Sequence, residues 1–301
     1  MICLSSPARS IPTIRLSTND KKVMEFRTLV SIPEPTFRIE PLEEMLFVGS
    51  CFADSIGQRF SEERFRTTVN PDGTMYNPVS VLHSIERWLN TSTNLTQKGR
   101  LVVFITLGTN HVYRLNSTGE IVDNCQKRPQ RLFTEEELSV DACVNVLQQT
   151  IDLLRSCRDN VEVVLTVSPI RYAKYGFHES QLSKATLLLA VDRIVKTSQA
   201  VYFPAYEIVL DELRDYRFFC EDMLHPTPQA VEYIWQQLTA HYFSAAALRF
   251  LKEWKPIKEA LNHRPFHPEN TEYQQFLAET RKKEQELLER YKAYGQLSEL
   301  P

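Results

Sequence analysis

Four short apolar runs dominate the hydrophobic pattern of the chain. They are rich in β-branched and aromatic residues and lie at Met45–Gly49, Leu101–Leu107, Val161–Val167 and Val201–Leu210. Near-continuous apolar runs of this length are typical of strands that are buried on both faces of a parallel sheet. The pattern therefore predicts four strands inside a covered sheet.

Helical periodicity fills the intervals between these runs. Phe52, Ile56 and Phe60 recur every four residues after the first run. Two further apolar stripes precede the third and fourth runs, and they consist of Val140, Cys143, Val144, Leu147, Ile151 and Leu154, and of Leu182, Ala185, Leu189 and Ile194. A closing helix is predicted near Pro228–Leu248. This alternation predicts an α/β fold with an open, mostly parallel sheet, which binds ligands at the carboxyl ends of its strands.

The two ends of the chain differ from its middle. Residues 1–23 are rich in Ser, Thr and Pro and lack periodicity, so we expect a disordered N-terminal tail. Residues 24–253 carry the main domain. Residues 254–301 are expected to form a helical extension around one long helix, Thr271–Tyr294, whose middle is polar and is expected to be solvated. A packing arm or a homo-oligomer contact is the expected role of this helix.

Composition narrows the functional classes. The net charge of −3 over 301 residues provides no general basic field, so nucleic acid and anionic membranes are poor partners. The six cysteines include no CxxC pair, which argues against a zinc ribbon or a disulfide framework. Without an apolar run of membrane-spanning length or a secretory signal, the expected location is the cytoplasm. No metal or organic cofactor is implied, and a small neutral or acylated substrate fits best.

Ser50 lies at the first strand end and is a candidate nucleophile. It follows Gly49 and runs directly into a predicted helix, whose N-terminal partial charge favours a developing anion. Serine is also a common helix cap, and taken alone Ser50 fits that role better.

Asp222 and His225 lie in a loop between the last strand and the closing helix. The carboxylate of Asp222, three residues before His225, is close enough to accept a hydrogen bond from the imidazole and fix its tautomer. A histidine oriented in this way is the base that a serine nucleophile needs. An ordinary turn with an Asp cap would have the same sequence.

Gly108 and Asn110 follow the second strand. Glycine permits close backbone approach, and the Asn110 amide could donate to an oxyanion, a contact worth about 3–4 kcal/mol in a transition state. An ordinary turn is the alternative. Because all three motifs lie at strand ends in a compatible order, together they favour a serine esterase, acyl hydrolase or acyltransferase.

This combination resembles a known family. Gly49–Ala53 reads GSCFA, the motif that names the GSCFA family, a bacterial group related to the SGNH/GDSL hydrolases. Asn70–Pro78 resembles the asparagine-proline loop of that family, and the resemblance covers roughly residues 24–290. Two positions depart from the family pattern, since Gln126 and Tyr172 stand where histidine is frequent, which affects substrate contacts rather than the nucleophile.

The resemblance implies a three-layer α/β/α SGNH-hydrolase-like fold with a C-terminal helical extension. It implies a catalytic triad of Ser50, Asp222 and His225 that acts on a small-molecule or glycan acyl ester. The oxyanion hole would be formed by Ser50, Gly73, Gly108 and Asn110, and we expect substrate contacts from Tyr76, His111 and Arg171.

Two other interpretations remain open. In one, the protein is a catalytically inactive relative that binds an acylated glycan or metabolite, which a Ser50–His225 separation too long for a hydrogen bond would favour. In the other, Cys51 is the nucleophile, since a thiol at a helix start can be activated. The sequence disfavours this last interpretation, because the residue after an SGNH-like serine usually points into the fold.

Overall fold

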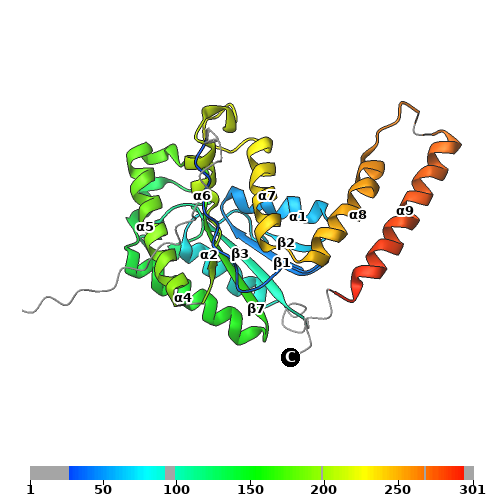
Figure 1. The fold of residues 1–301 in the computed structure, drawn as a ribbon. Coiled ribbons are helices and arrows are strands. Elements are labelled where there is room, and N and C mark those ends of the chain that lie inside the picture. The colour runs from blue at the N-terminus through cyan, green and yellow to red at the C-terminus, as the bar shows by residue number, and fades with distance from the viewer. Residues whose placement is uncertain (1–26, 92–98, 198, 268, 295–301) are drawn as a thin grey trace, which may run out of the picture.

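The computed structural model describes residues 27–91, 99–197, 199–267 and 269–294. At its centre lies a parallel five-stranded sheet (Figure 1). The strand order is β2 (Arg66–Val69), β1 (Glu44–Gly49), β3 (Leu101–Leu107), β7 (Val161–Val167) and β8 (Val201–Tyr202). Every pair in this sheet is parallel, which confirms the mostly parallel sheet that the apolar runs predict.

Helices cover both faces of the sheet. The side chains of Phe47 and Phe104 face a core with α1 (Cys51–Glu62) and α7 (Pro228–Tyr242). The intervening Leu46 and Val103 face the opposite core. That second core is completed by α2 (Pro78–Leu89), α4 (Val140–Cys157) and α5 (Phe177–Lys196). This alternation along each strand confirms a three-layer α/β/α arrangement.

Side-chain caps set the starts of these helices. Ser50, Asn77, Ser139 and Thr227 each accept a hydrogen bond from a backbone N–H in the first turn of the helix that follows. Proline occupies the first turn of α2 and α7, where its missing N–H costs nothing. In each case the last residue of the preceding loop therefore fixes where the helix begins.

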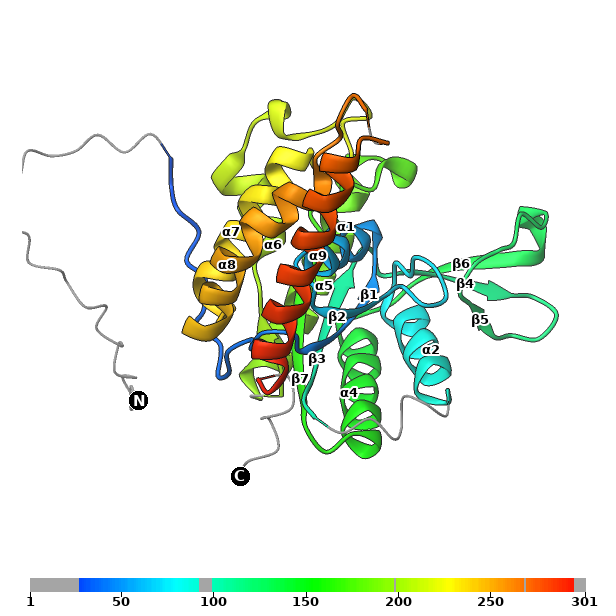
Figure 2. The ribbon, with the colours of Figure 1, turned by 90° about the vertical axis from the view of Figure 1, so that its right-hand side faces the viewer.

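A small antiparallel sheet projects from the edge of the main body (Figure 2). It contains β4 (His111–Leu115), β5 (Ile121–Val122) and β6 (Phe133–Glu137), in the order β5-β4-β6, with a short 3-10 helix, η1 (Gln130–Leu132), before β6. This insertion between β3 and α4 has no continuous apolar run, and the hydrophobic pattern did not predict it. Strand β2 was missed as well.

Two predicted elements have the wrong extent. The fourth strand ends at Tyr202 and is followed by helical turns, α6 (Ala205–Glu207) and η3 (Ile208–Leu213). Pro204, which cannot donate to a strand ladder, lies at this change. The closing helix also ends early, because extended Phe243 pairs with Ile39 and Ser244 then caps a new helix, α8 (Ala245–Asn262).

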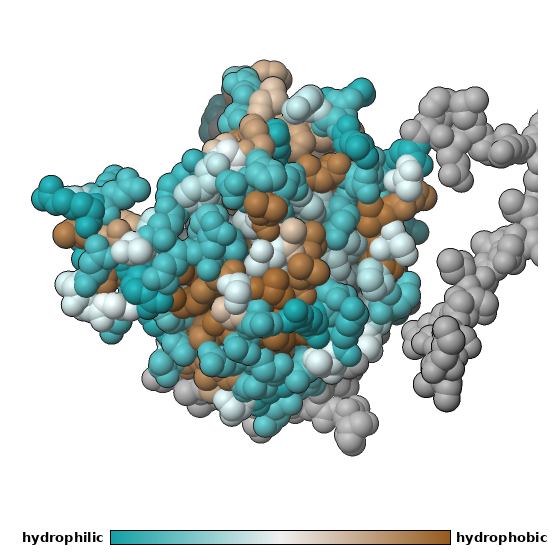
Figure 3. All heavy atoms as spheres, turned by 90° about the vertical axis from the view of Figure 1, so that its left-hand side faces the viewer, coloured by the Kyte–Doolittle hydropathy of each residue, from teal (hydrophilic) through white to brown (hydrophobic). Residues whose placement is uncertain are grey.

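Helix α5 buries largely a different face from the predicted one, because Ile194 is the one residue of the predicted stripe that is buried. Leu182 and Leu189 are 49% and 56% exposed. Figure 3 shows that apolar residues are interspersed with hydrophilic ones on one face of the molecule. The buried side of the helix instead includes Ser183, Lys184 and Leu187. The apolar stripe predicted the helix correctly but not its orientation.

The C-terminal part is a pair of helices beside the main body (Figure 1). Helix α9 (Thr271–Lys292) packs on α8 through a small core of Phe250, Trp254, Leu287 and Tyr291. The middle of α9 is largely solvated, as its polar sequence predicts, since five of the seven residues from 280 to 286 are exposed. Thr280 is buried, and Glu284 pairs with Arg64 at 2.5 Å. Among the described helices, none combines the length and apolarity needed to cross a membrane.

Gly49 allows β1 and β3 to approach each other at their carboxyl ends. Its φ of +141° is rarely adopted by residues with a side chain, and an added Cβ would overlap the carbonyl oxygen of Thr106. We expect Gly49→Ala to lower the free energy of unfolding by about 3 kcal/mol, measured by urea denaturation.

Gly119→Ala is the matched control for this substitution. Gly119 also has a positive φ, +75°, but no heavy atom lies within 4 Å of its added Cβ. Its cost should be about 1 kcal/mol, the conformational part alone. Equal losses for the two variants would contradict the steric explanation.

Candidate functional site

The carboxyl edge of the sheet gathers the residues that the sequence singled out. Ser50 follows β1, Gly108 and Asn110 follow β3, and Arg171 lies four residues after β7. Strand pairing keeps these ends level, since Gly49 is opposite Thr106 and Thr106 is opposite Thr166. The candidate site is therefore assembled by parallel register.

Ser50 faces the interior of the protein. It is 1% exposed, and its Oγ lies 3.1 Å from Thr106 Oγ1 and accepts a hydrogen bond from Phe52 N at 3.3 Å. Its backbone N–H donates to the carbonyl of Thr106 at 2.9 Å. The hydroxyl thus caps α1 and ties it to β3.

Cys51 is the first residue of α1 and is partly exposed. Its Sγ lies 3.2 Å from the phenol oxygen of Tyr76, which is 36% exposed. Burial and the neighbouring thiol raise the pKa of Tyr76 well above its ordinary value, so the phenol keeps its proton at neutral pH. The Cys51 side chain is thus partly exposed while it also packs against the core, so it does not point fully into the fold as the sequence led us to expect.

Asp222 and His225 form a hydrogen-bonded pair in the loop before α7. Asp222 Oδ2 lies 2.5 Å from His225 Nδ1, and Asp222 Oδ1 accepts from the backbone N–H groups of His225 and Leu224 at 3.0 and 2.9 Å. These bonds lower the pKa of Asp222 to about 2, the backbone donors contributing most. Both side chains are partly exposed, and within the described chain no hydrogen bond links His225 to Ser50.

Each donor that was expected in the oxyanion hole has an acceptor within the protein. The N–H of Gly73 donates to Asn70 O and that of Gly108 to Tyr76 O, both at 2.8 Å. Asn110 Nδ2 donates to Leu138 O at 2.8 Å, while Asn110 Oδ1 is buried and has no partner among the described atoms. The Ser50 N–H is likewise bonded, so the backbone N–H groups of Ser50, Gly73 and Gly108 are all engaged within the protein.

A row of aromatic side chains connects two of the expected substrate contacts. From Tyr76, ring centroids follow at 6.1 Å to Tyr172 and 5.5 Å to Tyr175, and the Tyr175 ring stacks on His111 at 4.1 Å. Tyr113 on β4 joins the far end through a 2.8 Å contact with the Tyr175 hydroxyl, in the 3-10 helix η2 (Ala173–Tyr175). The sequence did not predict this row, which leads from Cys51 towards the projecting sheet.

The loop that contains Gln126 borders a cavity of about 410 Å³. His83, Arg87, Asp72 and Asp123 form an ion-pair network along it. Gln126 has a positive φ of +48°. The histidine that is frequent in the family at the position of Gln126 would therefore lie beside this cavity and not at the carboxyl end of β1.

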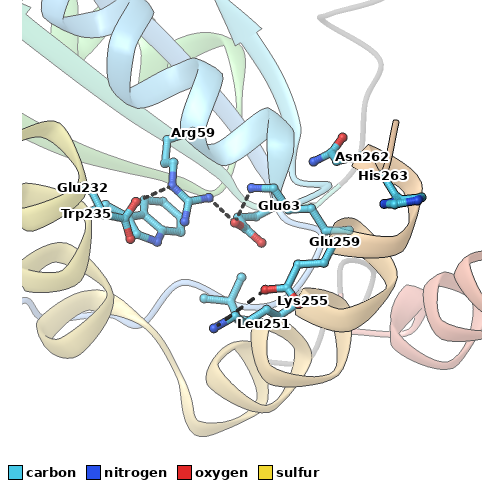
Figure 4. Close-up of a pocket in the computed structure, with 10 residues that line it drawn as sticks. Arg59, Glu63, Glu232, Trp235, Leu251, Lys255, Glu259, Asn262 and His263 are labelled. Carbon is cyan, nitrogen blue, oxygen red and sulfur yellow. Dashed lines mark hydrogen bonds and ion pairs between the residues drawn. The ribbon is translucent and has the colours of Figure 1, made fainter. Parts of the chain in front are cut away.

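A larger cavity of about 490 Å³ lies between α1, α7 and α8 (Figure 4). Arg59 is held there by Glu63 and Glu232 and lies over the ring of Trp235 at 4.7 Å. Arg59 follows Ser50 by nine residues, which places it roughly 14 Å away along the helix axis. This cavity is separate from the candidate site.

No group of three or more His, Cys, Asp and Glu side chains in the described ranges is arranged to hold a metal ion.

Lys184 is buried behind the carboxyl edge. It is 2% exposed, its Nζ donates to Ser168 O at 2.8 Å, and the described residues offer it no carboxylate partner. Burial lowers its pKa to about 7. An anionic substrate does not reach this amine, whose role here is structural.

The low pKa of Lys184 predicts a pH-dependent stability. Between pH 7 and its ordinary value of 10.5, the unfolded chain binds one more proton than the folded chain, so stability rises with pH. Lys184→Met should remove this rise, so that its stability relative to wild type is most favourable below about pH 7. Urea denaturation over this range measures it, with Lys196→Met on the exposed side of α5 as control. Parallel curves for wild type and Lys184→Met would refute the assignment.

The hydrogen bonds to Asp222 predict a second titration. Because its folded pKa is lowered from 3.8 to about 2, the carboxylate holds the turn at and above pH 3.8 and releases it as the pH falls through about 2. The amide-proton NMR shifts of Leu224 and His225, which donate to it, should move with that midpoint and should not titrate in Asp222→Asn. A midpoint near 3.8 would contradict the bonding.

Solved structures that resemble this chain include a catalytic mutant of Axe2, an acetylxylan esterase from Geobacillus stearothermophilus (12% identity, 69% of this chain and 98% of that chain, TM-score 0.44). A carbohydrate esterase family 3 protein from Talaromyces cellulolyticus has 11% identity, coverages of 70% and 98%, and a TM-score of 0.38. No curated protein matches the sequence.

The sequence matches the GSCFA family over residues 44–101 and 91–238. Residues 254–299 match the C-terminal domain of GSCFA domain proteins. These matches confirm the resemblance that the Gly49–Ala53 motif indicates. The chain therefore belongs to the GSCFA family.

Proposed function

We propose that the protein cleaves an acyl ester, on a small molecule or a glycan, and passes the acyl group to water or to an acceptor hydroxyl. The Asp222–His225 pair carries this proposal. Its carboxylate engages Nδ1 of the imidazole at 2.5 Å, which leaves Nε2 as the basic nitrogen. The low pKa of Asp222 keeps its carboxylate charged at neutral pH. A charged carboxylate is required to stabilise the imidazolium that forms when the histidine accepts a proton.

The chemistry requires a nucleophile from the turn between β1 and α1. His225 Nε2 would take the proton of the nucleophile as it attacks the acyl carbon, and would return that proton to the leaving alcohol. An acyl-enzyme then forms while the ester C–O bond breaks. Water or a second alcohol, deprotonated by the same imidazole, releases the acyl group and restores the enzyme.

Ser50 is the nucleophile expected from the sequence. Its hydroxyl would have to leave Thr106 Oγ1 and Phe52 N and turn outward before it could attack a substrate. Its 1% exposure makes this a costly first step, because a buried backbone N–H would lose its acceptor.

Cys51 is a second candidate, and the geometry favours it. The thiol is partly exposed at the first position of α1, and it lies beside the Tyr76 hydroxyl at 3.2 Å. With Cys51 as nucleophile the acyl-enzyme is a thioester. Ser50 then keeps its capping role and holds the turn.

The absence of a Ser50–His225 hydrogen bond among the described residues meets the criterion for an inactive, ligand-binding relative. Catalytic hydrogen bonds often tighten only in the substrate complex, so this geometry does not decide between the two interpretations. Measuring activity does.

The test is hydrolysis of p-nitrophenyl acetate, p-nitrophenyl butyrate and acetylated sugars by the purified protein and its variants. We expect His225→Ala to lower kcat/KM by about 10³-fold or more. Cys51→Ala should abolish turnover, while Cys157→Ala, which removes another partly exposed thiol, should retain it.

The acyl-enzyme identifies the nucleophile directly. Mass spectrometry after rapid acid quench should locate the acyl group on Cys51, in a thioester that neutral hydroxylamine cleaves. Acyl transfer to Ser50, lost in Ser50→Ala and kept in Cys51→Ala, would instead establish the serine mechanism. No turnover and no acyl-enzyme on any of these substrates would favour the binding interpretation.

A further inference from the structure

Arg171 connects the loop after β7 to the turn that carries Asp222 and His225. Its backbone N–H donates to Leu224 O and its Nη1 donates to Met223 O, both at 3.0 Å. These two carbonyls belong to the peptide groups between Asp222 and His225. One residue thus binds the turn twice from a separate part of the chain.

The turn is held from both of its polar sides. Its N–H groups at Leu224 and His225 donate to Asp222 Oδ1, and its C=O groups at Met223 and Leu224 accept from Arg171. Met223, between them, has a positive φ of +58°, which costs on the order of 1 kcal/mol for a residue other than glycine. The paired hydrogen bonds stabilise this conformation.

The guanidinium of Arg171 is itself fixed by aromatic rings. Its Cζ lies 4.0 Å from the ring centroid of Phe177, 5.5 Å from that of Phe219 and 6.0 Å from that of Tyr216. Phe219 belongs to the same loop as the turn, where it pairs with Pro226. Cation–π contacts hold the planar fork in the orientation that reaches Met223 O.

The described residues place no carboxylate within ion-pair distance of Arg171. Arg114 on the projecting sheet, by contrast, has such a partner in Glu136 at 2.8 Å. A backbone carbonyl takes that place at Arg171. This bonding differs from the substrate contact that the sequence led us to expect, since the donor is already engaged by the turn.

We propose that Arg171 is a positioning residue for the Asp222–His225 pair. It sets the backbone of the turn, and through the backbone the direction of the imidazole. The proposal rests on the proposed ester chemistry for its catalytic consequence, while its structural part can be measured without activity.

The test compares Arg171→Met, which keeps much of the packing and the backbone bond to Leu224 O but loses the side-chain donor to Met223 O, with Arg171→Lys, which restores one side-chain donor. Arg217→Met is the matched control, because Arg217 lies in the same loop and, among the described residues, forms its ion pair with Asp215 near the surface. We expect Arg171→Met to lower kcat by about 100-fold, as a small misplacement of a catalytic group does, with KM nearly unchanged. Arg171→Lys should recover part of the loss, and Arg217→Met should match wild type.

Hydrogen exchange provides the second measurement. The amide protons of Leu224 and His225 should exchange at least about 10-fold faster in Arg171→Met than in wild type or Arg217→Met, as local opening becomes easier. Unchanged exchange would overturn the proposal.

An increase in KM with kcat intact would also overturn it, in favour of a substrate contact at Arg171. If wild type cleaves none of the esters, the proposed function fails, and faster exchange in Arg171→Met alone would still show that Arg171 holds the turn.

Discussion

The close contact between the carboxyl ends of β1 and β3 determines the geometry of the candidate site. Gly49 has no side chain, so the backbone of β1 can approach Thr106 closely enough for Ser50 to direct both its N–H and its hydroxyl at that residue. The polar groups of Ser50 are consequently turned inward. The next residue, Cys51, begins α1 and is partly exposed beside Tyr76. A packing constraint between two strands thus decides which of two adjacent nucleophilic side chains is accessible.

Much of the fold could be predicted from the sequence because its central strands are buried on both faces. β1, β3 and β7 are continuous apolar runs, and each was predicted to within one residue. The prediction that the whole fourth run is a strand was wrong, because its apolar residues after Pro204 are buried in helical turns. A short buried helix has the same apolar pattern as a buried strand. The predicted orientation of α5 was wrong because the buried side of this helix carries the polar Lys184. The burial of its amine is tolerated because Ser168 O, from another part of the chain, accepts its hydrogen bond.

The candidate site was predictable in outline, since the rule that ligands bind at strand ends brings together the turns that matter. It does not tell which groups remain free there. Ser50 and Thr106 are 56 residues apart, and Asn110 and its acceptor Leu138 are 28 apart. Such acceptors leave no periodic signal in the sequence. The local Asp222–His225 motif was predictable, because three residues of spacing suffice to form its hydrogen bonds.

The two halves of the proposed machinery are therefore held by different kinds of interaction. The nucleophile end is fixed by strand register and by a helix cap inside the core, where movement would break buried hydrogen bonds. The base end is a partly exposed turn, held by Asp222 on its N–H side and by Arg171 on its carbonyl side. Exposed hydrogen bonds open more readily than those of a core strand. Adjustment to a substrate should therefore take place at the turn, while the start of α1 keeps its position.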